Sequence, residues 1–309
     1  MQYVFIINPI AGRRDASVWL EPAVRAAAAR QGAAVVIHRT ACRGDARRLA
    51  ARYVASGERV NLYACGGDGT LNECAVGAAG FANAAVTHYP MGSGNDFLRM
   101  FGPDAPRFYD LKELLDAPQA PMDLIDCNGH LALNVCSVGF DARIGLGAGD
   151  FKGLPLVSGT MAYQLSAVRA ILQGIHRPYR VSIDGEELPG SEFTLMCACN
   201  GRYYGGGFNP SRTAMPDDGL LDFVVIPAVS RLTVVSLIGK YAKGGAGDIE
   251  GVVVRRGREM HVVCDRVSRI NLDGEEMLDS ELSVTVSAKK VNFFYPAGTH
   301  WDPARRSKT

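Results

Sequence analysis

Along the first third of the chain, short apolar runs alternate with Ala-rich or amphipathic segments of helical length. Strands that alternate with helices predict βαβ units, in which a parallel sheet is covered by helices on both faces. We therefore expect a doubly wound α/β domain over residues 1–121. Its expected strands are 3–7, 34–40, 60–65 and 84–89, and its expected helices are 19–30, 45–55, 70–79 and 96–101.

Beyond residue 121 the pattern changes to short apolar runs separated by turn signals such as Asn128-Gly129 and Asp184-Gly185. Dipeptides of this kind favour two-residue hairpins, so we expect a mostly antiparallel β-sandwich domain over residues 122–296, with a tail at 297–309. Expected within it are strands at 122–127, 131–138, 180–183, 193–199, 220–226, 252–255, 260–264, 267–272, 282–287 and 291–295, and helical insertions near 159–175 and 230–242.

The composition and charge of the chain argue against a nucleic-acid-binding, secreted or membrane-spanning protein. The chain of 309 residues has a net charge of +1, so no bulk electrostatic argument favours nucleic acid. Its 8 cysteines include no CxxC pair, which indicates buried thiols in a reducing compartment, and its 6 histidines form no ligand-spaced cluster. The N-terminus lacks the basic segment of a signal peptide, and no apolar run reaches membrane-spanning length. We therefore expect a cytoplasmic protein without a transmembrane segment, which would reach lipid only by peripheral contact with the membrane.

Two glycine-rich turns follow neighbouring strands of the expected parallel sheet. One reads "GGDGT" at 66–70 and the other "GSGND" at 92–96. In such sheets ligands bind beyond the carboxyl ends of the strands, where loops 8–12 and 40–45 also fall. A glycine cluster at one turn is also compatible with a plain structural turn. Two adjacent backbone nests that each open a helix suit a polyphosphate, because main-chain N–H groups and helix dipoles attract anions.

Seven short motifs share their order and spacing with one known family. They are "INPIAG" at 7–12, "GGDGTLNE" at 66–73, "GSGNDF" at 92–97, "NVCSVGFDA" at 134–142, "NGRYYGGGF" at 200–208, "PDDGLLDF" at 216–223 and "NLDGEE" at 271–276. Over about residues 1–296 the chain resembles the diacylglycerol kinase catalytic-domain family, which includes soluble bacterial lipid kinases and the sphingosine and ceramide kinases.

The resemblance implies a lipid kinase with two domains and an active site in the cleft between them. It implies ATP as co-substrate, Mg²⁺ as cofactor and transfer of the γ-phosphoryl group to the hydroxyl of a diacylglycerol-like lipid at the membrane surface. Two alternatives in the same superfamily are a sphingosine-type kinase and an NAD kinase-like enzyme. A third alternative is a catalytically idle protein that binds lipid or nucleotide. The oligomeric state stays open, with a homodimer as one alternative.

The resemblance also assigns residues to the nucleotide. Asp68 is expected at the metal and the phosphates, where charge neutralisation and positioning supply most of the catalysis of phosphoryl transfer. Arg13 and Arg14 either add positive charge there or form a solvated loop. The expected ATP-binding residues are Asn8, Thr40, Gly66, Gly67, Asp68, Gly69, Thr70, Leu71, Asn72 and Ser93.

A second metal position is implied by "MPDDGLLD" at 215–222. By resemblance, the side chain of Asp218 and the carbonyls of Met215 and Leu220 bind Mg²⁺, with Asp123 linked to the ion through water. Few protein ligands and several waters are typical of this cation. A plain turn before a strand is the alternative reading of the same residues.

The acceptor-activating carboxylate is ambiguous from the residues alone, because "DGE" occurs at 184–186 and again at 273–275. The resemblance selects the second, with Glu275 as the catalytic proton acceptor and Asp273 as its catalytic neighbour, over Glu186. A further stripe of apolar residues at helical spacing either packs on the β domain or lines a groove for acyl chains. Its members are Met161, Leu165, Val168, Leu172 and Ile175.

Overall fold

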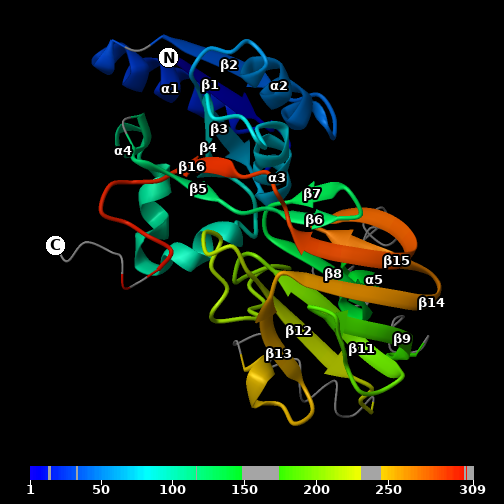
Figure 1. Cartoon of the computed structure of the whole chain (residues 1–309). Coiled ribbons are helices and arrows are strands. Elements are labelled where there is room, and N and C mark those ends of the chain that lie inside the picture. Colours follow the sequence, from blue (N-terminus) through cyan, green and yellow to red (C-terminus); the bar gives the residue numbers. More distant parts are fainter. Residues whose placement is uncertain are drawn as a thin grey trace, which may run out of the picture. The chain divides into compact units, whose positions relative to one another are not determined.

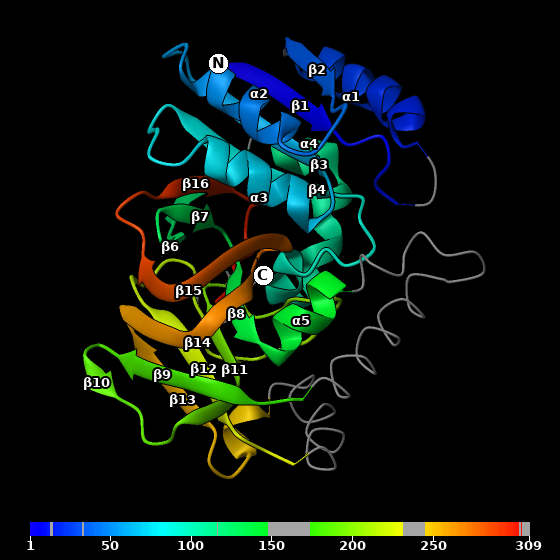
Figure 2. The same ribbon diagram turned by 90° about the vertical axis from the view of Figure 1, so that its right-hand side faces the viewer.

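The computed structural model describes residues 1–302 and 304, apart from 13, 14, 33, 116, 148–173 and 231–244. The described chain forms two compact units, shown from two directions in Figures 1 and 2. The first unit combines Met1–Leu124 with Ala288–Thr309, and the second spans Ile125–Ser287. The expected helical insertions, and the apolar stripe except Ile175, lie outside the described residues.

The first unit is built on a six-stranded sheet with the order β2-β1-β3-β4-β16-β5. All neighbours are parallel except β16 and β5. Helices α2 and α3 pack together on one face of the sheet, and α1 and α4 pack together on the other (Figure 1). The elements are β1 Gln2–Ile7, α1 Ser17–Gln31, β2 Val35–Arg39, α2 Asp45–Val54, β3 Val60–Gly66, α3 Asp68–Gly77, β4 Ala84–Pro90, the 3₁₀ segment η1 Phe97–Tyr109, α4 Leu111–Leu115, β5 Gln119–Met122 and β16 Val291–Phe294.

The central strands of this sheet are buried on both faces, which is why they read as continuous apolar runs. Phe5 of β1 stacks on Tyr63 of β3 with ring centroids 4.0 Å apart. The doubly wound α/β fold expected from the sequence is confirmed. The segment expected as a helix at 96–101 is instead a longer 3₁₀ segment, because Gly102 has a φ of 58° and Pro103 and Pro106 interrupt any α-helix.

Strand β16 returns from the end of the chain to the first sheet. It pairs with β4 in parallel and with β5 in antiparallel fashion, and the Asn292 side chain donates to the Ala84 carbonyl oxygen over 3.1 Å. The sequence-based division placed 291–295 in the second domain. The structure groups it with the first, because a strand pattern identifies a strand but does not identify its partner.

The second unit is a connected ten-stranded sheet in which all pairings are antiparallel. The mostly antiparallel β domain expected from the sequence is therefore confirmed. Its elements are β6 Ile125–Cys127, β7 His130–Ala132, β8 Val135–Gly139, α5 Phe140–Gly147, β9 Arg177–Ile183, β10 Glu186–Glu187, β11 Glu192–Cys199, β12 Leu221–Pro227, the 3₁₀ turn η3 Ala246–Asp248, β13 Val253–Gly257, β14 Glu259–Leu272 and β15 Glu275–Val286.

Three two-residue hairpins connect neighbouring strands of this sheet. Asn128, Asp184 and Asp273 all have φ near +50°, and a glycine with positive φ follows each. These are the conformations that Asn-Gly and Asp-Gly turns adopt, so the expected hairpins are present.

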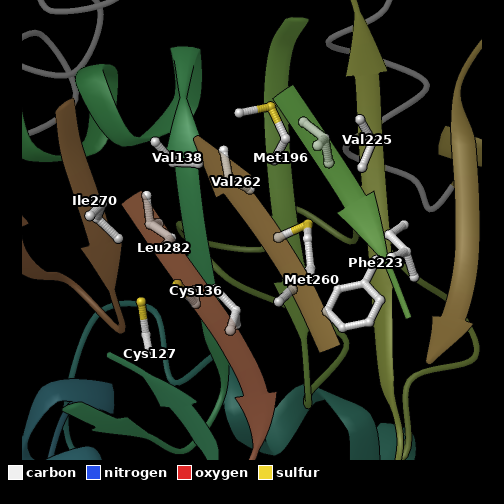
Figure 3. Close-up of a cluster of buried hydrophobic side chains, with 14 of the residues drawn as sticks. Cys127, Cys136, Val138, Met196, Phe223, Val225, Met260, Val262, Ile270 and Leu282 are labelled. Carbon is white, nitrogen blue, oxygen red and sulfur yellow. The ribbon is translucent and has the colours of Figure 1, made fainter. Parts of the chain in front are cut away.

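The core of the second unit is a cluster of buried apolar side chains contributed mainly by β8, β9, β11, β12, β14 and β15, as Figure 3 shows. The long strand β14 pairs with β15 on one side, and with β9 and then β8 on the other. Two strands were expected here, at 260–264 and 267–272. The structure has a single strand whose register shifts between Val263 and Ser268, because a bulge can bend a strand without ending it. All eight cysteines are free thiols, and only Cys42 is exposed.

Candidate active site

Three loops meet at the carboxyl edge of the first sheet. A Cβ on Gly92 would lie 2.5 Å from the Cα of Gly67, so the two glycine-rich turns touch through their main chains. A Cβ on Gly12 would lie 2.8 Å from the carbonyl oxygen of Met91, and the Asn8 side chain approaches Thr70 Oγ1 to 3.4 Å. The loops at 8–12, 66–70 and 91–96 therefore form one continuous surface, as the sequence pattern predicted.

Helix α3 begins at this surface without a side-chain cap. Its N-cap is Gly67 in an extended conformation, and no side chain of the described residues bonds to the helix start. The N–H groups of Thr70 and Leu71 bond to the Gly67 carbonyl. Main-chain N–H groups and the positive end of the helix dipole at such a start attract anions.

Asp68 lies in the first turn of α3 and reaches the second glycine-rich turn. Its Oδ1 accepts the Phe97 N–H over 3.1 Å. A Cβ on Gly94 would lie 3.2 Å from its Oδ2, and within the described chain that oxygen accepts no hydrogen bond. One carboxylate oxygen therefore ties the two turns together while the other faces the loop surface. A metal bound to phosphates takes ligands of this kind.

The same turn is also held by His88, a residue to which the sequence analysis assigned no role. It is fully buried, and burial lowers its pKa against the opposing effect of the Asp68 charge. Its Nε2 lies 2.9 Å from the Gly66 carbonyl oxygen, which can only accept, so Nε2 carries the proton. The same carbonyl accepts the Met91 N–H over 2.7 Å. A neutral His88 therefore fixes the end of β3.

The loop after β2 carries Thr40, whose N–H donates to the Ile7 carbonyl over 2.9 Å. Asp45 Oδ2 accepts the N–H groups of Ala41 and Cys42 over 2.8 and 3.3 Å. Bonding to Arg48 and to these N–H groups lowers the pKa of Asp45 to about 2. In the second turn, Ser93 is exposed, and Asn95 stabilises that turn by bonding to both main-chain groups of Gly92.

In the second unit, Asp273 is a main-chain anchor. Its two carboxylate oxygens accept the N–H groups of Leu133, Asn134 and Val135 over 2.7 to 2.8 Å. These bonds hold the hairpin that carries Glu275 against the start of β8. Glu275 is half-buried and pairs with Leu272 at the end of the hairpin.

The other Asp-Gly-Glu hairpin, at 184–186, has the same type of turn, but its glutamate lies in a different environment. Asp184 Oδ1 accepts the N–H groups of Arg258 and Glu259 over 2.9 and 3.0 Å. The Glu186 side chain is 70% exposed and forms an ion pair of 2.8 Å with Arg255 of β13. Its carboxylate is neutralised at the surface, which is not the environment of a proton acceptor.

Asp218 presents oxygen ligands of the type that Mg²⁺ prefers, but both of its carboxylate oxygens are engaged. Oδ1 accepts the Leu220 N–H over 3.0 Å, and Oδ2 forms an ion pair with Arg256. Arg256 also donates from Nε to the buried Asp222 over 3.0 Å. One carboxylate and two carbonyls fit the cation chemically, and a cation here would have to displace Arg256 from Oδ2.

Asp123 belongs to the first unit, where it is fully buried and pairs with Lys290 over 2.7 Å. The residues expected at the second metal are thus divided between the two units, and their meeting at one ion stays a prediction. The described residues contain no group of three or more His, Cys, Asp or Glu side chains arranged to hold a metal.

Two further motif residues meet in the second unit without having been assigned a role. Asp141, in the first turn of α5, accepts a hydrogen bond of 2.8 Å from the Tyr204 hydroxyl. Burial raises the pKa of Asp141 to about 6, although bonds from Ser137 and Tyr204 act in the opposite direction. Both motifs were visible in the sequence, but nothing in either showed that they meet.

Comparison with known proteins agrees with this architecture. Residues 2–127 match the family model of the diacylglycerol kinase catalytic domain, and residues 134–295 match the YegS C-terminal NAD kinase beta sandwich-like domain. A "Probable lipid kinase YegS-like" of Pseudomonas aeruginosa is 34% identical over 281 residues, which cover 89% of this chain and 90% of the relative. The chain belongs to the diacylglycerol kinase catalytic-domain family, among its YegS-like members.

Two other proteins are similar to this chain, one in sequence and one in fold. A protein of the same name from Pseudomonas fluorescens is 33% identical over 82% of this chain and 83% of its own length. A "putative diacylglycerol kinase" from Bacillus anthracis has a solved structure that shares the fold, with a TM-score of 0.70 and 22% identity over 98% of this chain and 97% of the other. Among the described residues, no helix is both long and apolar enough to cross a bilayer.

Proposed function

We propose that this protein is a lipid kinase that transfers the γ-phosphoryl group of ATP to the hydroxyl of a diacylglycerol-like lipid. Membership of a family whose relatives are named lipid kinases supports the reaction class. The observation that carries the proposal is the convergence of three glycine-bearing loops on the uncapped start of α3. That arrangement provides main-chain donors and a helix dipole for a polyphosphate.

The residues of the first unit bind and orient the nucleotide. Main-chain N–H groups within Gly66–Asn72 hold the phosphates, while Asn8, Thr40 and Ser93 border the same site. Asp68 is oriented by its bond to the Phe97 N–H and binds the Mg²⁺ that accompanies ATP. That cation, when bound, neutralises charge that develops on the transferring phosphoryl group.

The residues of the second unit act on the acceptor. Glu275 orients the lipid hydroxyl and takes its proton, because an alcohol is a poor nucleophile until a base removes the proton. Asp273 holds the Glu275 hairpin in place through three main-chain bonds. Within the second unit, the side chain of Asp218 and the carbonyls of Met215 and Leu220 would hold a second Mg²⁺. The substrate requires that the enzyme work at a membrane surface, and its free thiols fit the reducing cytoplasm.

The proposal is tested with the full chain, γ-labelled ATP, Mg²⁺ and mixed micelles that contain one candidate acceptor at a time. The acceptors are diacylglycerol, ceramide, sphingosine and, without micelles, NAD. We expect label in diacylglycerol. Label only in a sphingoid lipid or in NAD would assign a different substrate, and ATP binding without transfer to any acceptor would indicate an idle nucleotide-binding protein.

A further inference from the structure

The N-terminus of helix α2 is capped by a side chain from helix α3. Glu73 Oε1 accepts the Gly44 N–H over 2.8 Å, and its Oε2 accepts the N–H groups of Ala46 and Arg47 over 3.1 and 3.4 Å. No side chain of α2 caps this end, and the N-cap residue Gly44 is in the left-handed conformation with φ of 84°. The position of the α2 start is therefore set by a carboxylate on the helix that opens from the phosphate loop.

The two helices are also in main-chain contact one turn further along α3. A Cβ on Gly77 would lie 2.5 Å from the carbonyl oxygen of Arg47 and 2.8 Å from the Cβ of Ala50. Figure 2 shows α2 and α3 side by side on their face of the sheet. Glu73 and Gly77 lie on the same face of α3, because residues four apart are neighbours on a helix. Together they allow little movement of α2 along or away from α3.

Four main-chain N–H groups in the loop between β2 and α2 are already bonded, because Thr40 donates to the Ile7 carbonyl oxygen and the other three donate to side chains. Asp45 takes the N–H groups of Ala41 and Cys42, and Glu73 takes that of Gly44. The start of α3, in contrast, has no side-chain cap among the described residues. Phosphates therefore belong at α3, and a nucleotide that also reaches Thr40 presents an uncharged part, the nucleoside, to this loop.

We propose that Glu73 is a positioning residue that couples the nucleoside side of the site to its phosphate side, by fixing the loop at 40–44 relative to α3. The proposal rests on the proposed function, because it takes ATP as the nucleotide. Both carboxylate oxygens of Glu73 already accept main-chain N–H groups at the start of α2, so we assign Glu73 to positioning rather than to direct contact with the nucleotide. Removing the Glu73 carboxylate should therefore weaken the binding of ATP much more than it weakens the binding of a triphosphate chain alone.

The test compares Glu73→Gln with Asn83→Ala, which acts at the opposite end of the same helix. The Asn83 side chain donates to the carbonyl oxygens of Val54 and Glu58 over 3.0 and 2.9 Å, so its removal loosens α2 without touching the loop at 40–44. Calorimetry measures the affinity of each full-length variant for ATP and, separately, for inorganic tripolyphosphate. Melting temperatures show how far each change destabilises the protein in general.

We expect Glu73→Gln to weaken the affinity for ATP about three- to thirty-fold, which is the factor that corresponds to losing a helix cap. The affinity for tripolyphosphate should stay unchanged within about two-fold. Asn83→Ala should leave both affinities unchanged at a comparable loss of melting temperature. Should Glu73→Gln fail to fold, Glu73→Asp provides the same comparison, since it keeps the charge but withdraws the carboxylate by one methylene.

Three results would overturn the inference: unchanged ATP affinity in Glu73→Gln, equal weakening of ATP and tripolyphosphate, or equal weakening of ATP by Asn83→Ala. A wild-type protein that binds tripolyphosphate as tightly as ATP would also overturn it, because no nucleoside contact would then exist. A wild-type protein that binds neither would instead remove the proposed kinase function itself.

Discussion

Replacing Asp273 by Asn should destabilise the second unit strongly while sparing the chemistry. The carboxylate accepts three main-chain N–H groups at the start of β8. The amide of Asn keeps one acceptor oxygen and turns an NH₂ group toward donors. Bonds from N–H groups to a charged acceptor contribute about 1.5–3 kcal/mol each, so we expect a loss of about 2–4 kcal/mol. For a unit of this size, that loss lowers the melting temperature by about 5–12 °C.

The matched control is Asp184→Asn in the duplicate hairpin, where the carboxylate accepts two exposed N–H groups. Its cost should be about half or less, because water replaces the lost acceptor at an exposed site. Thermal unfolding of the full-length variants followed by circular dichroism measures both. Lipid phosphorylation well below the melting temperature should stay within about ten-fold of wild type for Asp273→Asn. A shift of less than about 2 °C for Asp273→Asn, or an equal shift for Asp184→Asn, would refute the anchoring role.

Three more predictions follow from the same geometry. Glu275→Gln should lower kcat about 10²- to 10⁴-fold with unchanged ADP affinity, whereas Glu186→Gln should have little effect; the reverse order would put the base in the other hairpin. Magnesium without ATP should raise the wild-type melting temperature and raise it further in Arg256→Gln, which removes the competing cation; no shift in Asp218→Asn is the control. Because the folded pKa of Asp141 is raised to about 6, wild type should lose up to about 3 kcal/mol of stability relative to Asp141→Asn as pH rises from about 4 to 6, and nothing further above that; parallel pH profiles would refute this.

The parts of the fold that local patterns determine could be predicted from the sequence. Buried parallel strands gave continuous apolar runs, and the hairpin at Asp273-Gly274 was marked by its dipeptide, because only residues that tolerate positive φ suit that turn. The convergence of the glycine-rich loops followed from the rule that the carboxyl ends of parallel strands share one edge. Gly67 and Gly92, 25 positions apart in the sequence, indeed touch.

Features that depend on distant partners could not be predicted. The pattern at 291–295 shows a strand but not its partners β4 and β5. The bulge that keeps β14 continuous leaves a local signature indistinguishable from a turn. Likewise, Glu73 and Asp141 owe their roles to Gly44 and Tyr204, which are distant in sequence and identified only by the fold.

The hydrogen bonds that each motif carboxylate already accepts indicate whether it positions other groups or binds a metal. A proton or a metal on a carboxylate that accepts several main-chain N–H groups competes with those donors for its lone pairs, and a buried donor left unpaired costs about 1–3 kcal/mol. Asp273 and Glu73 each accept three main-chain N–H groups, so we assign both to positioning other groups. Asp68 differs, because it commits Oδ1 to the Phe97 N–H while Oδ2 accepts nothing within the described chain. An oriented carboxylate with one available oxygen can bind a cation at no such cost, which is why Asp68 is the acidic residue of the first unit that we assign to the metal.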